Sequence, residues 1–341
     1  MIPIHPGEAA AAGSTYAELS RRIASAGLMA RRPGYYTAKV TATVAALLAG
    51  WAAFLLLGNT WWQMLVAAFL GLAFTQVAFV GHDAGHRQIF RTRRAAYVAG
   101  LLLGNLGIGL SYGWWVDKHN RHHAHPNDLD TDPDIKAGAL VYTSGQARLR
   151  RGVSRWLSRI QAYLFFPMLL LEGLNLHLSS GRALTGRTVR SRRVRALEAA
   201  LFLAHVAGYL TVVFLVLSPI HAIVFVVVHQ AVFGLYMGMS FAPNHKGMPV
   251  PTGADQRDYL RRQVLTSRNI RGGRFVDFAL GGLNYQIEHH LFPSMPRPNL
   301  HHARALVRSF CTEHDVSYTE TGPVRSYAIV LKHLNTVGTS M

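Results

Sequence analysis

The stretch Trp61-Trp-Gln-Met-Leu-Val-Ala-Ala-Phe-Leu-Gly-Leu-Ala-Phe-Thr-Gln-Val-Ala-Phe-Val80, followed directly by Gly81-His-Asp-Ala-Gly-His86, decides the fold. A helix needs about 20 mostly apolar residues to cross a bilayer, and the first part supplies them. If the helix continues beyond the bilayer, His82 and His86 project from one face, because residues four apart are neighbours on a helix. The sequence therefore predicts a membrane span that presents two imidazoles at the membrane surface.

Two further clusters have the same kind of spacing: His119-Asn-Arg-His122-His123 and Gln286-Ile-Glu-His289-His290. In a chain with 18 histidines among 341 residues, one such box is a weak signal, and surface or capping histidines on basic loops are the alternative. Three boxes in order, each beside an apolar segment, favour a metal site. Imidazole binds Fe, Zn, Cu and Ni, and a catalytic zinc takes only three protein ligands. The seven clustered histidines therefore predict two metal ions.

The composition predicts a membrane protein, because 50% of the residues are hydrophobic and the net charge is +18. This pairing fits apolar spans with basic flanks. Residues 1–34 show no signal-peptide pattern and are expected to form a loose cytosolic N-terminal tail, with the membrane domain over residues 35–341. We expect four transmembrane helices in two hairpins, at about residues 41–58, 61–80, 196–218 and 219–240.

Charge sets the expected orientation of these spans. The turns Asn59-Thr60 and Ser218-Pro219 are uncharged, whereas Lys and Arg gather at the opposite ends of both hairpins. The positive-inside rule therefore puts both termini and the active site in the cytoplasm, with residues 81–195 and 241–341 as cytosolic parts. The predicted fold is an all-α integral membrane protein, in which a cytosolic helical cap holds a His-rich dimetal site.

Two shorter apolar stretches, Tyr97–Leu110 and Ala162–Leu174, are near the length at which a span is not expected. A span at Tyr97–Leu110 would also carry the box at His119–His123 to the other face of the membrane. We therefore expect both stretches to be half-buried or interfacial helices. The basic segment Arg148–Gln161, which contains Trp156, has the composition of a helix lying in the membrane interface.

Several residues are candidates to complete the site. His245 follows the fourth span at the depth of His82 and is the eighth ligand candidate, and Gln286 offers an amide oxygen for weak or water-mediated ligation. Carboxylates often accept the second ring N–H of a metal-bound histidine. Acidic residues beside the ligands could fill this role: Asp83, Asp117, Asp132 and Glu288.

Other residues are expected to have ordinary packing roles. The sole cysteine, Cys311, excludes an intrachain disulfide and a Cys-ligated iron–sulfur cluster, and we expect a packed thiol there. Surface or packing positions are expected for His125, His177, His301 and His302. Neutral imidazoles bonded to a neighbouring helix are expected for His205, His221 and His229.

The quoted boxes resemble those of the membrane fatty acid desaturase family, over roughly residues 40–300. Gly81–His86, Lys118–His123 and Asn284–Pro293 are similar to the acyl-CoA and acyl-lipid branch, and the Gln-led third box resembles the front-end desaturases. The resemblance implies a diiron centre, O2 as co-substrate and two electrons per turnover. It also implies iron ligation by His82, His86, His119, His122, His123, His245, His289 and His290.

The chain departs from the family pattern at two places. A desaturase resemblance suggests an Asn four residues before His245, where Phe241 stands, while Asn244 is adjacent instead. Many front-end members carry a fused cytochrome b5 domain, for which we expect no room before the first span. The expected electron donor is therefore a separate protein, ferredoxin-like or cytochrome b5-like with its reductase.

The expected function is O2-dependent desaturation of a long-chain fatty acyl-CoA or acyl-lipid, with no catalytic residues beyond the metal ligands. The reacting methylenes are neither charged nor acidic, so the protein must hold the chain and exclude water. Expected tunnel residues are Tyr112, Trp114, Trp115 and Phe292. The basic face suits anionic lipids, CoA or carrier phosphates, or an acidic electron carrier, and not nucleic acid, because its arginines follow the membrane flanks.

Two other functions are compatible with the boxes. A related diiron hydroxylase or oxygenase of acyl chains, alkanes or carotenoids would use the same ligands. A metal transporter is a more distant alternative, and it predicts ligands at the bilayer midplane.

Overall fold

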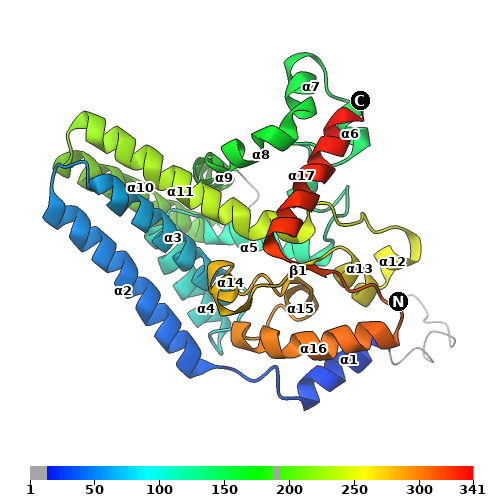
Figure 1. The fold of residues 1–341 in the computed structure, drawn as a ribbon. Helices are drawn as coiled ribbons and strands as arrows, with labels where there is room; N and C mark the ends of the chain where they lie inside the picture. The colour runs from blue at the N-terminus through cyan, green and yellow to red at the C-terminus, as the bar shows by residue number, and fades with distance from the viewer. Residues whose placement is uncertain (1–13, 187–191, 341) are drawn as a thin grey trace.

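A computed structural model describes residues 14–186 and 192–340. Four of its helices are long and apolar enough to cross a membrane: α2 (Pro33–Leu57), α3 (Gln63–Gly85), α10 (Arg192–Val216) and α11 (Pro219–His245). Each one covers an expected span, which confirms a helical protein with four apolar candidate spans. In Figure 1 the four helices lie side by side and most of the shorter helices gather toward one end.

The helices α3 and α11 form the centre of this arrangement. α3 packs along α11 on one side and α2 on the other, and most of its residues are buried. Gly71 permits the close approach, since a Cβ there would lie 2.9 Å from the backbone oxygen of His229 on α11. α3 contains His82 and ends at Gly85, so that His86 caps it, and α11 ends at His245. The two central helices thus deliver their last turns to the same region.

The two shorter apolar stretches form parts of bent helix pairs. The helix α4 (Arg93–Gly100) continues into the π-helix η2 (Leu101–Gly107), and together they meet α5 (Tyr112–Ala124) at 113°. The helices α8 (Gln161–Leu169) and α9 (Glu172–Thr185) meet at 73°. Each pair is long and apolar enough to cross a membrane only if its two parts are taken together, so it is either a broken span or a re-entrant loop.

The remaining elements are short and surround the ends of α3 and α11. One two-residue parallel pairing joins β1 (Asn269–Ile270) to β2 (Glu320–Thr321). The other helices are η3 (Pro133–Ile135), α6 (Ser144–Arg148), α7 (Gly152–Arg159), α12 (Gly253–Arg257), α13 (Tyr259–Leu265), α14 (Gly273–Ala279), α15 (Gln286–Leu291), α16 (Arg297–Glu313) and α17 (Pro323–Thr339).

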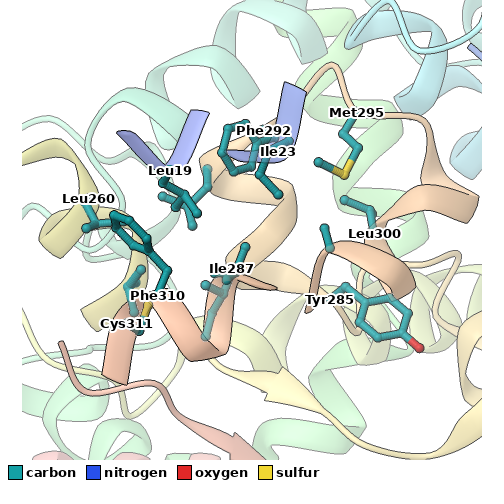
Figure 2. Close-up of a cluster of buried hydrophobic side chains, with 14 of the residues drawn as sticks. Leu19, Ile23, Leu260, Tyr285, Ile287, Phe292, Met295, Leu300, Phe310 and Cys311 are labelled. Carbon is teal, nitrogen blue, oxygen red and sulfur yellow. The ribbon is translucent and has the colours of Figure 1, made fainter. Parts of the chain in front are cut away.

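The expectation of a loose tail is wrong from Ser14 onward, while residues 1–13 lie outside the described part of the chain. Residues Thr15–Ser25 form α1, whose Leu19 and Ile23 are fully buried in a cluster with α13, α15 and α16 (Figure 2). Burying each of these side chains contributes about 1.5–3 kcal/mol. Leu19 and Ile23 are four positions apart, which is the spacing of an apolar helix face, but the polar and Ala-rich composition of this segment obscured that pattern. Cys311 lies in the same cluster, as a packed thiol should.

Candidate metal centre

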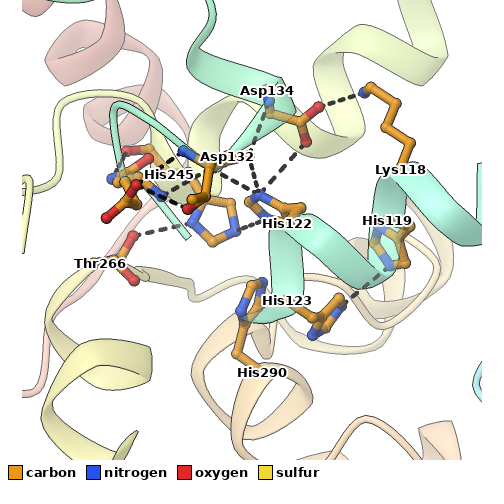
Figure 3. Close-up of polar contacts among 12 residues, drawn as sticks. Lys118, His119, His122, His123, Asp132, Asp134, His245, Thr266 and His290 are labelled. Carbon is orange, nitrogen blue, oxygen red and sulfur yellow. Dashed lines mark hydrogen bonds and ion pairs between the residues drawn. The ribbon is translucent and has the colours of Figure 1, made fainter. Parts of the chain in front are cut away.

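Four elements bring the histidine boxes together. The end of α3 supplies His82 and His86, α5 supplies the second box, α15 the third, and α11 ends on His245. The ligand atoms form two groups within which all lie less than 4.8 Å apart. One group is His82, His86, His119 and His289, and the other is His122, His245 and His290. Figure 3 shows His122 beside His245 and His123 beside His290.

The first group joins two boxes by a direct approach of ring nitrogens. His119 Nε2 lies 2.9 Å from His86 Nε2. The rings of His82 and His289 lie 4.8 Å apart, centroid to centroid. Nitrogens bound in neighbouring positions of one metal ion at about 2.1 Å stand about 3 Å apart, so this spacing fits shared ligation.

The second group joins the α5 box to the end of α11. His122 Nε2 lies 3.3 Å from His245 Nε2, and the His245 and His290 rings are 4.7 Å apart. Gln286 Nε2 lies 2.9 Å from His245 Nε2. Asn244 Nδ2 donates to Gln286 Oε1 and to the Leu283 carbonyl, so the amide nitrogen of Gln286 faces the centre. Asn244 and Gln286 therefore both belong to this side of the site.

His123 lies between the two groups. Its Nε2 is 3.1 Å from His119 Nε2 in the first group, and its ring stacks on His290 of the second at a centroid distance of 4.2 Å. The structure thus brings all eight predicted histidines into one region, with His123 as the link.

Hydrogen bonds made by Nδ1 orient several rings so that Nε2 can bind a metal ion. His122 Nδ1 donates to the buried carboxylate of Asp132 at 3.0 Å (Figure 3). His245 Nδ1 donates to the Thr266 carbonyl at 3.0 Å, and His290 Nδ1 donates to Gln263 Oε1 at 2.9 Å. A donor at Nδ1 fixes the tautomer in which Nε2 carries the lone pair that a metal needs.

A third chain of contacts orients the first box. His82 Nδ1 lies 3.3 Å from Asp83 Oδ1, and Asp83 Oδ2 pairs with Arg297 at 2.7 Å. Arg297 also donates to the Phe79 carbonyl, so the ion pair is tied to the same turn of α3. Asp83 and Asp132 both occupy the positions expected of carboxylates that support a ligand.

The chemistry of the donor set fits metal ions. Burial holds the pKa of His86, His119, His123, His289 and His290 well below the usual histidine value, so these rings are neutral. Buried ring nitrogens without a hydrogen-bond partner in the described residues include His82 Nε2, His290 Nε2 and both nitrogens of His289. Such unsatisfied atoms are costly unless something binds them.

Two of the predicted carboxylates do not face the centre. Glu288 is buried but accepts from Asn269 and Tyr318 on the far side of α15, because the residue before the His pair points away from it. Asp117 is exposed and pairs with Arg121. Asp134, which was not predicted, lies 3.6 Å from His122 Nδ1 and also pairs with Lys118.

A cavity of about 590 Å³ adjoins the histidines. Tyr112, Trp114 and Trp115 line it, as predicted for a tunnel. Phe292 does not: it packs in the α1 cluster and stacks on Tyr16, which corrects its assignment. Of the candidate ligands, those in the lining are His82, His119, His122, His245 and Gln286.

Other histidines singled out from the sequence pack against neighbouring residues or face solvent. His229 bonds Tyr209 and His205 bonds the Leu106 carbonyl, each between neighbouring segments as expected. The same expectation is wrong for His221, which bonds Ser218 at the start of its own helix. His302 and His125 are exposed.

Comparison with known proteins gives the family. The fatty acid desaturase family model matches residues 59–322. The chain is 34% identical over 278 residues to the acyl-lipid (9-3)-desaturase of Physcomitrium patens, covering 80% of this chain and 52% of that protein. It is 30% identical over 293 residues to the Delta(8)-fatty-acid desaturase of Helianthus annuus, covering 82% of this chain and 63% of that protein.

A third relative is matched along more of its length. The Delta(6)-fatty-acid desaturase of Caenorhabditis elegans is 28% identical over 342 residues, covering 94% of this chain and 74% of that protein. The protein belongs to the fatty acid desaturase family. It spans about half to three quarters of the length of these relatives.

Proposed function

We propose that this protein catalyses O2-dependent desaturation of a long-chain fatty acyl substrate at a His-ligated diiron centre. The observation that carries the proposal is the pair of adjoining histidine groups at the wall of one largely apolar cavity. Family membership supports the same reaction. The proposed iron ligands are the eight clustered histidines: His82, His86, His119, His122, His123, His245, His289 and His290.

The bound irons would supply the oxidising power that removes two hydrogens from neighbouring methylenes with O2 and two electrons. The chain's own residues would position the imidazoles and the acyl chain and exclude water. Asp132, Thr266 and Gln263 hold imidazoles by their Nδ1 atoms. The apolar lining, including Ile108 and Met237, would exclude water and hold the acyl chain in place.

The position of the double bond is proposed to be near the carboxyl end. Lys118, Asp134 and Lys246 line the cavity. Lys118 donates to the Asp134 carboxylate and Lys246 to the Asp134 backbone carbonyl, and Asp134 lies beside His122. Charged groups this close to the centre suit the polar end of an acyl substrate, with the hydrocarbon tail in the apolar part. The Delta(6) and Delta(5) desaturases of Caenorhabditis elegans among the relatives agree with such a position.

The proposed arrangement in the membrane is two hairpins with a cytosolic cap. All the candidate ligands lie at or beyond one end of the long helices, next to basic flanks. In this orientation a separate ferredoxin-like or cytochrome b5-like protein would reduce the centre from the cytosolic face. The position of the ligands at helix ends also disfavours a transporter, whose sites lie at the midplane.

Expression in a host with defined fatty acids, followed by gas chromatography with double-bond localisation, tests the proposal. A new double bond near the carboxyl end is expected, together with two irons per chain in the purified protein. An exclusively hydroxylated product would favour the oxygenase alternative. A single bound zinc without O2 consumption would refute an oxidative reaction altogether.

A further inference from the structure

The buried carboxylate of Glu198 holds the helix that carries the second histidine box, without touching a histidine itself. Glu198, near the start of α10, is fully buried, and its contacts differ from those of Asp83 and Asp132, each of which lies against a histidine. Its Oε2 accepts from Ser111 Oγ at 2.8 Å and from the Gly113 backbone N–H at 3.1 Å. The carboxylate therefore binds the first turn of α5, the helix that carries the second histidine box.

The first backbone N–H groups of α5 donate hydrogen bonds to side chains and not to carbonyls of the helix itself. The groups at the start of a helix have no partner within it. Ser111 N–H donates to Ser180 Oγ on α9, Tyr112 N–H to Asn105 Oδ1 on η2, and Gly113 N–H to Glu198 on α10. The fourth, that of Trp114, donates to Ser111 Oγ. Three surrounding elements thus hold one helix end, and only Glu198 brings a carboxylate to it.

Glu198 and Asn105 also hold the sharp bend before α5. Asn105 Nδ2 donates to the Glu198 carbonyl at 3.1 Å while its Oδ1 accepts from Tyr112. The approach is close enough to require glycine, since a Cβ on Gly113 would lie 2.4 Å from Glu198 Oε1. A negative charge at a helix N-terminus is also electrostatically favourable.

The direction of α5 matters because its histidines reach both metal groups. His119 belongs to the first group and His122 to the second. At about 1.5 Å rise per residue, a tilt of about 10° about Ser111 would move His122 by about 3 Å. Metal–ligand distances tolerate only about 0.2 Å. A fixed N-terminus is therefore needed for both groups to keep their geometry.

We propose that Glu198 is a positioning residue, whose carboxylate fixes the N-terminus of α5 and thereby aims His119, His122 and His123 at the metal centre. This inference rests on the proposed metal centre but not on the identity of the reaction. The amide of Glu198→Gln keeps an acceptor oxygen, whereas Glu198→Ala leaves the Ser111 and Gly113 donors unpaired. Glu198→Gln removes the charge alone, whereas Glu198→Ala also removes the acceptor oxygens and the bulk, so the two variants separate the effect of charge from that of the contacts.

The test measures cobalt binding and the visible Co(II) spectrum, which reports ligand geometry, beside the thermal midpoint of the metal-free protein. Glu198→Ala is expected to weaken Co(II) binding by about 10–100-fold, as the loss of a supporting partner does, and to change the spectrum. Glu198→Gln should recover most of that loss. Glu313→Ala, an exposed acidic position on α16, should match the wild type.

A second pair keeps the test valid if Glu198→Ala does not fold. Gly113→Ala should perturb Co(II) binding although alanine is the better helix former, because its methyl would meet the carboxylate. The shorter acid in Gly113→Ala/Glu198→Asp should restore part of the binding. A wild-type spectrum and affinity in Glu198→Ala or in Gly113→Ala would overturn the proposal. Wild-type protein that binds metal but forms no double bond would instead refute only the proposed reaction.

Discussion

The Nε2 atoms of His122 and His245 lie 3.3 Å apart, although the residues are separated by 123 positions in the chain. Both rings are held by hydrogen bonds at Nδ1, one to Asp132 and one to Thr266. Two rings locked in this way from different elements present converging lone pairs, which is the arrangement that a metal ion requires.

Removing either ring should therefore empty the second group. His122→Ala and His245→Ala are each expected to lower bound iron by about one ion per chain and activity by more than about 100-fold, while membrane insertion persists. Metal analysis of the purified protein, with product analysis by gas chromatography, measures both. The exposed His302→Ala is the control and should retain its iron. Equal losses in all three variants would show that the ligand assignment is not selective.

Asp132, whose carboxylate holds His122, should raise the metal affinity of the site without binding the metal itself. Asp132→Asn is expected to lower metal affinity by about 10–100-fold, because the amide cannot hold the Nδ1 proton as firmly. Titration with Co(II) gives the affinity. Asp117→Asn is a matched control on an exposed acid that pairs with Arg121. Similar affinities for Asp132→Asn and wild type would mean that the His122 tautomer is fixed by something else.

Gln286 presents its amide nitrogen to His245. Gln286→Ala should therefore cost less bound metal than His245→Ala, but should still reduce activity, since Asn244 and His245 both lose a neighbour. Iron content and turnover of the two variants, measured side by side, compare these roles. An iron loss in Gln286→Ala as large as in His245→Ala would identify the amide oxygen as a ligand after all.

Cys311 should be inert, which makes the chain convenient for mapping its topology. Burial raises the pKa of its thiol to about 12, so the thiol stays protonated at pH 8 and the native protein should not react with a maleimide. A cysteine at Asn59, between α2 and α3, should then react in intact cells with a membrane-impermeant maleimide. One at His302 should react only after lysis. The reverse pattern would contradict the proposed cytosolic cap.

The first helix should contribute to stability. Leu19→Ala removes a fully buried side chain from the α1 cluster, and a cost of about 2–5 kcal/mol is expected. Thermal unfolding of the purified protein measures the effect. Arg21→Ala, on the exposed face of the same helix, should change the midpoint little. A stable Leu19→Ala variant would mean that α1 packs without supporting the fold.

The sequence was enough to predict the spans and the histidine boxes, because apolar length and i, i+3, i+4 spacing are local properties. His245 was predicted to lie level with His82, and the structure does bring it to the other histidines, because α3 and α11 pack along each other. Local patterns do not say which element covers which face. Gln263 and Thr266 were missed for that reason: nothing near them resembles a metal motif, and only the packing of α13 brings them to the histidines.

The errors have the same origin. Phe292 follows the third box closely enough to suggest a cavity position, but α15 is so short that the chain has turned into the α1 cluster by that residue. Glu288 directly precedes a histidine and therefore faces the other side of the helix. The segment from Ser14 to Ser25 was predicted to be a tail because only two of its residues form the apolar face of a helix, among mostly polar and charged neighbours.

The cavity lining contains four of the eight clustered histidines. His82, His119, His122 and His245 line it, whereas His86, His123, His289 and His290 do not. In the proposed enzyme, an acyl chain in the cavity would therefore face only four of the eight ligands. If electrons enter through one of the four rings outside the lining, the centre can be reduced while an acyl chain still occupies the cavity.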